Sequence, residues 1–353
     1  MISAPREYSV IGMMSGTSLD GMDIACCTFL YKDRQWHHLI HHAETYPYDK
    51  RWRSLLGKLP QESQGTIEQV DEEYGMLIGN TIKHFIENHD LVPDFIGAHG
   101  HTVFHDPSAG LTLQIGNGKN IAKATGIRVV NDFRSQDLSL GGQGAPLVPI
   151  GDKMLFNDYD CCLNLGGFAN VSYDEQGYRL GYDIAPCNLI LNHLSSRLGY
   201  DYDDRGRLAR KGKSIPGLFS KLGSIPYYSE KPPKSLGKEW LEKNILPLFI
   251  DDEKALDLLH TATEHVAAEI SRNVHGRVLV TGGGAYNTYL IERISELSGS
   301  EIIIPDDLTI QFKEALIFAF LALKRMREEV NVLGSVTGAS RDHSAGKLHY
   351  PLE

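Results

Sequence analysis

The chain has 353 residues, 42% of them hydrophobic and 23% charged, an ordinary globular composition that suggests two or three domains at roughly 100–200 residues each. The net charge is −10 and the basic residues are scattered, which excludes an extended nucleic-acid surface. We expect no signal peptide and no membrane span, because no charged start precedes a long apolar run. The five cysteines fit neither a disulfide framework nor a zinc ribbon, so buried thiols in a reducing cytoplasm are expected.

The first half of the chain begins with consecutive strands and continues into a long helix. Strands are expected over residues 8–14 and 22–31, joined by the small polar segment SGTSLDG, which is too short for a helix. Apolar residues at helical spacing predict one amphipathic helix over residues 67–89. The remaining elements expected here are short: strands at 36–46, 95–99, 111–115 and 127–131, and a helix at 120–125.

The pattern restarts after the GGQGAPLVP segment. Strands at 161–165 and 168–173 are joined by a glycine pair, as at the start of the chain. The polar segment 200–250 contains five prolines and is expected to form irregular loops and short helices, as a lid or insertion. The other elements expected in this half are strands at 178–183, 277–281 and 301–305, and helices at 188–198, 252–273, 288–297 and 313–328.

Both halves therefore start with consecutive strands joined by glycine turns, followed by helices. This weak duplication predicts an α/β protein of two related domains, residues 1–134 and 135–353, with a central cleft that the glycine turns face. Such a clamp suits phosphoryl transfer, because closure excludes water from a nucleotide.

The first glycine turn carries side chains suited to a phosphate and its metal ion. Glycines let the backbone approach a phosphate, hydroxyls donate hydrogen bonds to it, and carboxylates can hold Mg²⁺. A hairpin turn that needs glycine only for its shape is the alternative. The nucleotide-binding candidates in this turn are Gly16, Thr17, Ser18, Asp20, Gly21 and Asp23.

Two further glycine groups occur at matching positions of the second half. One follows a strand in NLGGFAN, where its N–H groups would face phosphates, although a plain tight turn explains it equally well. The other ends a buried strand in TGGGAYN, where consecutive glycines open a flat surface for an adenosine, against the alternative of ordinary strand–helix packing. The candidates here are Gly166, Gly167, Asn170, Gly282, Gly283, Gly284 and Asn287.

The sequence lacks both a GxxxxGK(S/T) loop and a GxGxxG turn after a strand, so neither a P-loop nor a dinucleotide site is expected. Instead it resembles the anhydro-N-acetylmuramic acid kinases, within the actin-like sugar kinase superfamily. The resemblance starts at VIGMMSGTSLDGMDIA and covers nearly the whole chain, with the polar middle segment weakest. It continues in the family's order through GAHGHTVFHDP, LQIGNGKNIAKATGIRVVNDFRSQDLSLGGQGAPLVP, LNLGGFANV, GYDIAPCN, VTGGGAYN, KEALIFAFLA and SVTGAS.

The resemblance implies an actin-like two-domain fold and a kinase that uses ATP and Mg²⁺ in the cytoplasm, in recycling of cell-wall sugars. Water would attack C1 of a 1,6-anhydro amino sugar while the freed O6 receives the γ-phosphoryl group. A homodimer is also implied, with a small amino sugar as substrate and neither nucleic acid nor membrane as partner.

The resemblance also assigns roles to side chains. Asp183 matches the family's catalytic aspartate and would activate the water as general base; a cap or turn aspartate is the alternative. Arg134 suits the lactyl carboxylate, against a surface salt bridge. Glu314 matches a sugar contact, against a first-turn helix acid that interacts with the dipole. His101, Gln114 and Gln143 are further candidates to line the sugar site.

The histidines and several departures from the family pattern bear on the metal and sugar sites. The HGHTVFH segment has a glycine and proline context that indicates a loop without the helical spacing of a zinc protease, so no metal site is expected. The family usually has other residues at five positions, which puts the sugar specificity in question and could reduce turnover: His101, Asn117, Ile184, Ala185 and Cys187.

Three other functions stay open at this point. The altered sugar-site residues fit a kinase of a related sugar. A non-enzymatic ATP-binding module of the same fold would use nucleotide to bias a hinge, although the retained Asp183 favours chemistry. A metal hydrolase would rest only on the histidines.

Overall fold

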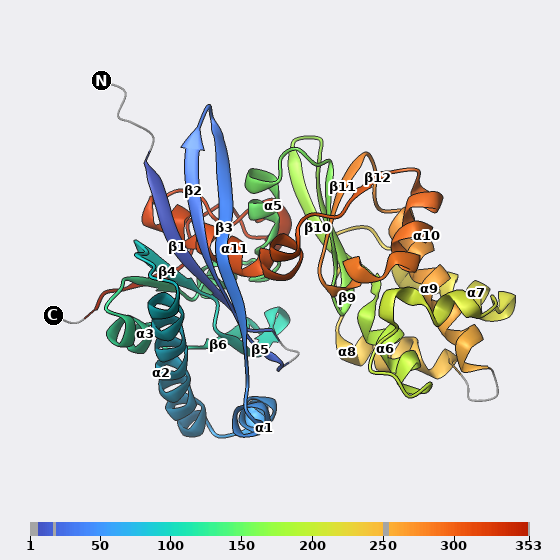
Figure 1. Ribbon diagram of the computed structural model, residues 1–353, viewed down its shortest axis with the longest axis horizontal. Coiled ribbons are helices and arrows are strands. Elements are labelled where there is room, and N and C mark those ends of the chain that lie inside the picture. Colours follow the sequence, from blue (N-terminus) through green and yellow to red (C-terminus); the bar gives the residue numbers. More distant parts are fainter. Residues whose placement is uncertain (1–5, 17–18, 250–253, 352–353) are drawn as a thin grey trace. The chain divides into compact units, whose positions relative to one another are not determined.

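The structure is a computed structural model that describes residues 6–16, 19–249 and 254–351 (Figure 1). It divides into two compact units, Met1–Leu155 with Phe312–Glu353, and Phe156–Gln311. The expected boundary after residue 134 placed residues 135–155 and the C-terminal segment in the second domain. They pack in the first unit instead, because residues 347–349 extend its sheet and Lys313 pairs with Asp152 at 3.1 Å.

The first unit is built on a six-stranded sheet with the order β13-β7-β4-β1-β2-β3. Strands β1 to β3 are antiparallel neighbours, β4 and β7 continue the sheet in parallel, and β13 pairs antiparallel with β7. A separate ribbon pairs β5 with β6. The strands are β1 (Glu7–Met14), β2 (Gly21–Lys32), β3 (Gln35–Pro47), β4 (Phe95–Ala98), β5 (His101–Asp106), β6 (Leu111–Ile115), β7 (Val129–Asn131) and β13 (Lys347–His349).

Helices cover both faces of this sheet. Ile11 and Met13 of β1 share a buried cluster with Tyr74 and Ile78 of α2. The intervening Gly12 faces α11, where a Cβ atom would lie 1.8 Å from the carbonyl oxygen of Ala315; since side chains alternate along a strand, α2 and α11 lie on opposite faces. The helices here are α1 (Lys50–Lys58), α2 (Gln64–Asn88), α3 (Gly118–Thr125), α4 (Ser135–Ser139), α5 (Pro149–Leu155), α11 (Asp307–Met326) and α12 (Gly334–Thr337).

The second unit has a five-stranded sheet with the order β10-β9-β8-β11-β12. Its strands are β8 (Cys161–Leu165), β9 (Phe168–Glu175), β10 (Tyr178–Pro186), β11 (Arg277–Thr281) and β12 (Glu301–Ile303). Its helices are α6 (Asn188–Ser196), α7 (Pro216–Gly223), α8 (Lys238–Asn244), α9 (Ala255–Ser271) and α10 (Thr288–Ser298). The 3₁₀ turns of the chain are η1 (Leu59–Gln61), η2 (Pro107–Ala109), η3 (Asp204–Gly206), η4 (Ala209–Lys211), η5 (Pro226–Ser229), η6 (Leu246–Leu248) and η7 (Gly283–Tyr286).

The two sheets repeat one topology. In each, the first three strands are antiparallel neighbours, and two later strands continue on the far side of the first strand in parallel. The orders β3-β2-β1-β4-β7 and β10-β9-β8-β11-β12 therefore correspond strand by strand. This confirms the α/β class, the duplication and the actin-like fold expected from the sequence. No helix within the described residues combines the length and apolar character needed to cross a membrane.

Three local expectations need correction. The HGHTVFH segment is not a loop, because residues 101–106 form β5 and pair with β6. Helix α11 begins at Asp307, six residues before the expected start at 313, since Asp306 accepts a hydrogen bond from the backbone N–H of Thr309 at 3.0 Å and so caps it. Helix α1 had no counterpart among the expected elements.

Candidate functional site

A row of polar side chains crosses four strands of the second sheet near the end where its glycine turns lie. Thr281 on β11 pairs with Asn164 on β8, Asn164 with Asn170 on β9, and Asn170 with Asp183 on β10. Directly paired residues project from the same face of a sheet, with Cβ atoms roughly 5 Å apart in antiparallel pairs. Asp183 therefore belongs to a strip of polar side chains that crosses four neighbouring strands on one face of the sheet.

Asp183 lies on the edge strand of this sheet, immediately before an irregularity in its pairing with β9. Its Oδ2 accepts a hydrogen bond from the backbone N–H of Leu236 at 2.9 Å. Its Oδ1 accepts none from the residues that the structure describes. Burial raises the pKa of Asp183 to about 6, and the Leu236 hydrogen bond opposes that rise. The carboxylate is thus ionised at neutral pH yet basic enough to take a proton.

Two of the three glycine groups meet beside this strip. Gly282 has φ 81°, and a Cβ atom there would lie 2.5 Å from Asn164 Oδ1. Gly284 packs against Leu165, so that a Cβ atom at position 284 would lie 2.6 Å from the Leu165 Cβ. These two glycines are required for close packing against β8, whereas a Cβ atom at Gly283 would meet only Asn188 Nδ2, at 3.8 Å.

The Gly166–Gly167 turn is tied to the start of α6. The Gly167 carbonyl accepts hydrogen bonds from the N–H groups of Cys187 (2.8 Å) and Leu189 (3.2 Å), and the Gly166 carbonyl accepts one from Asn188 (3.1 Å). The first N–H groups of α6 are therefore occupied by protein carbonyls. What this turn can offer a phosphate is its own N–H groups, as the sequence predicts, rather than the helix end.

A pocket of about 920 Å³ opens beside the GGGAYN segment. Its size is that of a small-molecule site. Tyr286 and Asn287 line it, and Asn287 also caps α10 by accepting a hydrogen bond from Leu290 N–H at 3.1 Å. The remaining lining residues come from α6, the segment 202–205, the GGGAYN segment itself, α10 and the residue after β12: Asn188, Leu191, Asn192, Tyr202, Asp203, Asp204, Arg205, Gly283, Gly284, Ala285, Thr288, Ile291, Glu292 and Ile304.

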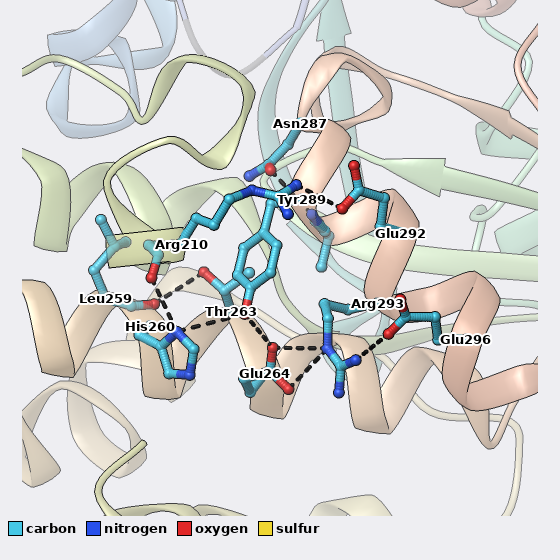
Figure 2. A network of polar contacts seen from close by, with 12 residues as sticks. Arg210, Leu259, His260, Thr263, Glu264, Asn287, Tyr289, Glu292, Arg293 and Glu296 are labelled. Atoms are coloured by element: carbon cyan, nitrogen blue, oxygen red, sulfur yellow. Dashed lines mark hydrogen bonds and ion pairs between the residues drawn. The ribbon is translucent and has the colours of Figure 1, made fainter. Parts of the chain in front are cut away.

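A network of charged and aromatic side chains supports one wall of this pocket (Figure 2). Glu292, which lines the pocket, accepts a hydrogen bond from Arg210 at 2.5 Å. The Arg210 guanidinium lies 4.7 Å from the ring centre of Tyr289. The Tyr289 hydroxyl donates to Glu264 at 2.6 Å, and Arg293 binds the same carboxylate at 2.9 Å. These contacts join α9, α10 and the 3₁₀ turn η4 into one support.

The candidates of the first glycine turn lie in the first unit. Thr17 and Ser18 lie outside the described residues, between Gly16 and Leu19. Gly21 is needed for packing, because a Cβ atom there would lie 2.5 Å from the Tyr46 carbonyl oxygen.

The two aspartates that follow this turn differ in exposure. Asp20 is exposed. Asp23 accepts a hydrogen bond from Thr45 Oγ1 at 2.6 Å. Burial raises the pKa of Asp23 more than this hydrogen bond lowers it, and Asp20 raises it further.

Half-buried Arg134 and buried His99 form a pair in the same unit. Nε and Nη2 of Arg134 donate to Nε2 of His99 at 3.0 and 2.9 Å, and Nη1 donates to the Gly144 carbonyl at 3.1 Å. Burial holds the pKa of His99 well below its ordinary value, so its Nε2 is free of a proton and can accept. Burial also lowers the pKa of Arg134 to about 10, which leaves it charged at neutral pH.

Half-buried Glu314 on α11 is a second candidate of this unit with an ionisable side chain. Burial raises the pKa of Glu314, while Lys313 and Arg134 lower it and Asp23 raises it. It makes no hydrogen bond within the part of the chain that the structure describes. A carboxyl group of this kind is available to a ligand hydroxyl.

The three other sugar-site candidates are placed differently. The ring of His101 is buried, with Nδ1 3.4 Å from Ser15 Oγ, and burial lowers its pKa to about 4. Gln114 lines a polar pocket of about 310 Å³ together with Asn117 and Lys119. Gln143 is exposed, and its backbone N–H donates to the Thr337 carbonyl at 2.8 Å. Among the described residues, no group of three or more His, Cys, Asp or Glu side chains is arranged to hold a metal ion.

Comparison with known proteins identifies the family. The model of the family described as anhydro-N-acetylmuramic acid kinase matches residues 8–351. The chain belongs to this family. The anhydro-N-acetylmuramic acid kinase of Sulfurimonas denitrificans is 33% identical over 367 residues, covering 96% of this chain and 98% of that protein. The one from Vibrio cholerae serotype O1 is 34% identical over 377 residues, covering 99% and 100%.

The likeness to solved structures is weaker. Component A of (R)-2-hydroxyglutaryl-CoA dehydratase from Acidaminococcus fermentans has a TM-score of 0.46 at 15% identity, covering 88% of this chain and 96% of that one. A glucokinase of the ROK family from Streptomyces griseus, in complex with glucose and AMPPNP, has a TM-score of 0.36 at 13% identity, covering 88% and 97%. Likeness at this level says nothing of this family member's activity.

Three of the departures from the family pattern lie in the core of the second unit. Ile184, Ala185 and Cys187 are at most 1% exposed and belong to its hydrophobic cluster. Their side chains therefore bear on packing behind Asp183. Asn117 has a different setting, because its Nδ2 donates to Asp71 Oδ2 at 3.0 Å.

Some residues of the site were not found by reading the sequence. Asn164 and Thr281 extend the polar strip, and Thr281 Oγ1 is buried without a hydrogen-bond partner among the described residues. A polar residue inside the apolar strand CCLNL was the available signal for Asn164. Arg205 and Glu292 line the 920 Å³ pocket, but they come from segments whose approach depends on the tertiary fold.

Proposed function

We propose that this protein is an ATP-dependent kinase that opens 1,6-anhydro-N-acetylmuramic acid with water and phosphorylates the freed O6. The product would be N-acetylmuramic acid 6-phosphate, in recycling of cell-wall sugars. The observation that carries the proposal is the setting of Asp183: a carboxylate in a polar strip, with Oδ1 unbonded within the described residues and with a pKa of about 6. Membership of the family supplies the substrate class.

Asp183 would act as the general base. It takes a proton from the water that attacks C1, while the bond between C1 and O6 breaks and O6 receives the γ-phosphoryl group of ATP. The arrangement is comparable to an inverting glycosidase in which phosphorylation replaces protonation of the leaving oxygen. A carboxylate with a pKa of about 6 is mostly ionised at pH 7 and still accepts a proton.

The nucleotide would use the glycine groups together with the 920 Å³ pocket. Gly282, Gly283, Gly284 and Asn287 would hold the adenosine, and the Gly166–Gly167 turn with Asn170 would face the phosphates. The first glycine turn would contribute Gly16, Thr17, Ser18 and Gly21 to the phosphates. Mg²⁺ would neutralise phosphate charge, and Asp20 and Asp23 are the carboxylates proposed to hold it.

Sugar contacts are proposed for the first unit. Arg134 keeps guanidinium N–H groups beyond the three that His99 and Gly144 occupy, and these suit the lactyl carboxylate. Glu314 would accept from a sugar hydroxyl. Gln114, His101 and Gln143 stay weaker proposals. The homodimer, the cytoplasmic location and the absence of a nucleic-acid partner also stay predictions.

Incubation of the protein with ATP, Mg²⁺ and 1,6-anhydro-N-acetylmuramic acid tests the proposal. Mass spectrometry should show a product heavier by one water and one phosphoryl group, formed in step with ADP. In ¹⁸O-water, the label should appear at C1 and not on the phosphate. Consumption of other amino sugars without turnover of this one would favour a related substrate, and nucleotide binding without any sugar turnover would overturn the kinase assignment.

A further inference from the structure

One segment of the second unit contacts both the backbone and the side chain of Asp183. The backbone N–H of Asp183 donates to the Lys234 carbonyl at 3.3 Å. Its carbonyl accepts from the Tyr227 hydroxyl at 2.7 Å, and its Oδ2 accepts from Leu236 N–H at 2.9 Å. All three partners come from residues 227–236, called the clamp segment here, within the polar stretch that sequence patterns left without a role.

The clamp segment is braced internally and against the unit's core. Lys234 Nζ donates to the Tyr227 carbonyl at 3.1 Å, and its ammonium lies 4.6 Å from the centre of the Tyr227 ring. The Tyr227 ring packs against Trp240 of α8 with 5.1 Å between centroids, and Tyr227 is only 6% exposed. Tyr227 and Lys234 are therefore linked to each other, and Tyr227 is held against α8, so the donor and acceptor groups of the clamp segment are fixed together.

Protection of a sheet edge explains only part of this arrangement. Strand β10 is an edge strand, and edge strands are commonly covered so that they do not pair with other chains. Contacts to the backbone N–H and carbonyl of Asp183 serve that purpose. The bond from Leu236 N–H to the side-chain carboxylate does not, since it satisfies no backbone group of the edge. It fixes the carboxylate plane and assigns different surroundings to its two oxygens.

We propose that the clamp segment is a positioning device for the catalytic base, with Leu236 N–H holding Oδ2 of Asp183 so that Oδ1 stays directed to the attacking water. Tyr227 is a second positioning residue, which holds the backbone at Asp183 through its hydroxyl. The inference rests on the proposed function, in which Asp183 is the base. It adds that a backbone N–H from the polar insertion completes the active site.

The direction of the expected pH effect follows from the groups around Asp183. An N–H donor favours the charged form of a carboxylate, so its removal raises the pKa. The other titratable groups facing this region are the phenols of Tyr182 and Tyr227, whose pKa burial raises, and Lys234, whose pKa burial lowers while Glu230 and Glu269 oppose that shift. The phenols stay neutral between pH 5 and 8, and Asp183, whose pKa burial raises to about 6, titrates inside that window.

Two substitutions at one position separate the backbone from the side chain. Leu236→Pro removes the N–H donor, and Leu236→Ala keeps it while shortening the side chain. The Asp183 carboxyl can be followed by ¹³C NMR of the full-length protein labelled at aspartate carboxyls, with the signal assigned by its loss in Asp183→Asn. We expect Leu236→Pro to move the Asp183 titration upward by about one pH unit and Leu236→Ala to leave it in place. An Asp183 titration at the same pH in the wild type, Leu236→Pro and Leu236→Ala would overturn the proposal.

Kinetics provide the second readout. In Leu236→Pro the acid limb of the kcat profile should shift to higher pH with the NMR titration, with KM for ATP unchanged. Tyr227→Phe keeps the ring packing and removes one hydroxyl. Tyr227→Phe should lower kcat several-fold without moving the Asp183 titration. A wild-type kcat in Tyr227→Phe would show that Tyr227 is not a positioning residue. This test holds even if Leu236→Pro does not fold. Because the titration needs no turnover, a failed kinase assignment and a failed clamp give different results.

Discussion

Asn170 on β9 lies directly opposite Asp183 on β10, and the two side chains project from the same face of the sheet. A neutral amide thus neighbours the proposed base where a carboxylate would repel it. The pair also links one expected nucleotide contact to the expected catalytic residue, so the second sheet alone places elements of both subsites side by side.

Asp183→Asn should strongly lower turnover while stabilising the fold above pH 6. We expect kcat to fall at least ~10²-fold, the scale of a lost general base, with nucleotide affinity retained. Burial raises the pKa of Asp183 to about 6, so its contribution to stability is full below about pH 4 and is lost as pH rises through 6. The amide avoids that loss, which is about 3 kcal/mol at pH 8 for a pKa raised from 3.8 to about 6. Urea unfolding at pH 8 and pH 4 measures the difference in unfolding free energy between the variant and the wild type, which should vanish at pH 4. Near-normal turnover in Asp183→Asn would contradict the assignment of Asp183 as the general base.

Asn170→Asp should make the base harder to ionise. Two carboxylates directly opposite each other on a sheet repel, and a like charge at this range raises a carboxyl pKa by about one unit. The acid limb of kcat should therefore move upward by about one pH unit. Asn170→Ser is the matched control, since it is polar and neutral and should leave the limb in place. An unchanged acid limb of the kcat profile in Asn170→Asp would show that the side chains at positions 170 and 183 are not neighbours in solution.

The regular elements of this chain were largely predictable from local pattern. Strand β8 and strand β11 have the bounds that alternation and apolar runs predict, 161–165 and 277–281. Helix α2 was expected at 67–89 and is Gln64–Asn88, because its apolar residues recur at helical spacing and Ser63 caps it. The three residues of β13 gave no such signal, since so short a strand exists only through its pairing with β7.

The candidate site was predictable from the sequence only where its residues form local motifs. The glycine groups stand out as local motifs, whereas Asp183 was assigned through the family resemblance, and the folded sheet brings Gly282 against Asn164. The clamp on Asp183 was not predictable, because its decisive donor is a backbone N–H at Leu236, 53 residues away along the chain. Backbone donors carry no residue signature, so only the folded arrangement reveals them.

Asn117→Asp should destabilise the first unit. Asn117 donates to Asp71 Oδ2 at 3.0 Å, while Asp71 Oδ1 accepts from Gly116 N–H at 2.7 Å. A carboxylate at position 117 would lose the donor and place two negative charges in contact, at a cost of about 1–2 kcal/mol. The loss should shrink near pH 4, where one carboxyl of the pair takes a proton and can donate. Addition of Asp71→Asn should restore stability at pH 8, and a double-mutant cycle without coupling between the two positions would contradict the expectation.

Gly283 and Gly284 of the GGGAYN segment should respond differently to alanine. At Gly284 a Cβ atom would lie 2.6 Å from Leu165 Cβ, whereas at Gly283 the nearest atom is Asn188 Nδ2 at 3.8 Å. Gly284→Ala should therefore lower the thermal midpoint, at about 1–3 kcal/mol for overpacking. Gly283→Ala should leave the midpoint unchanged and weaken binding of a non-hydrolysable ATP analogue several-fold, because Gly283 lines the 920 Å³ pocket and the added methyl would meet the adenosine. Calorimetry and thermal unfolding of both variants separate the two effects. Wild-type nucleotide affinity in Gly283→Ala would place the adenosine elsewhere.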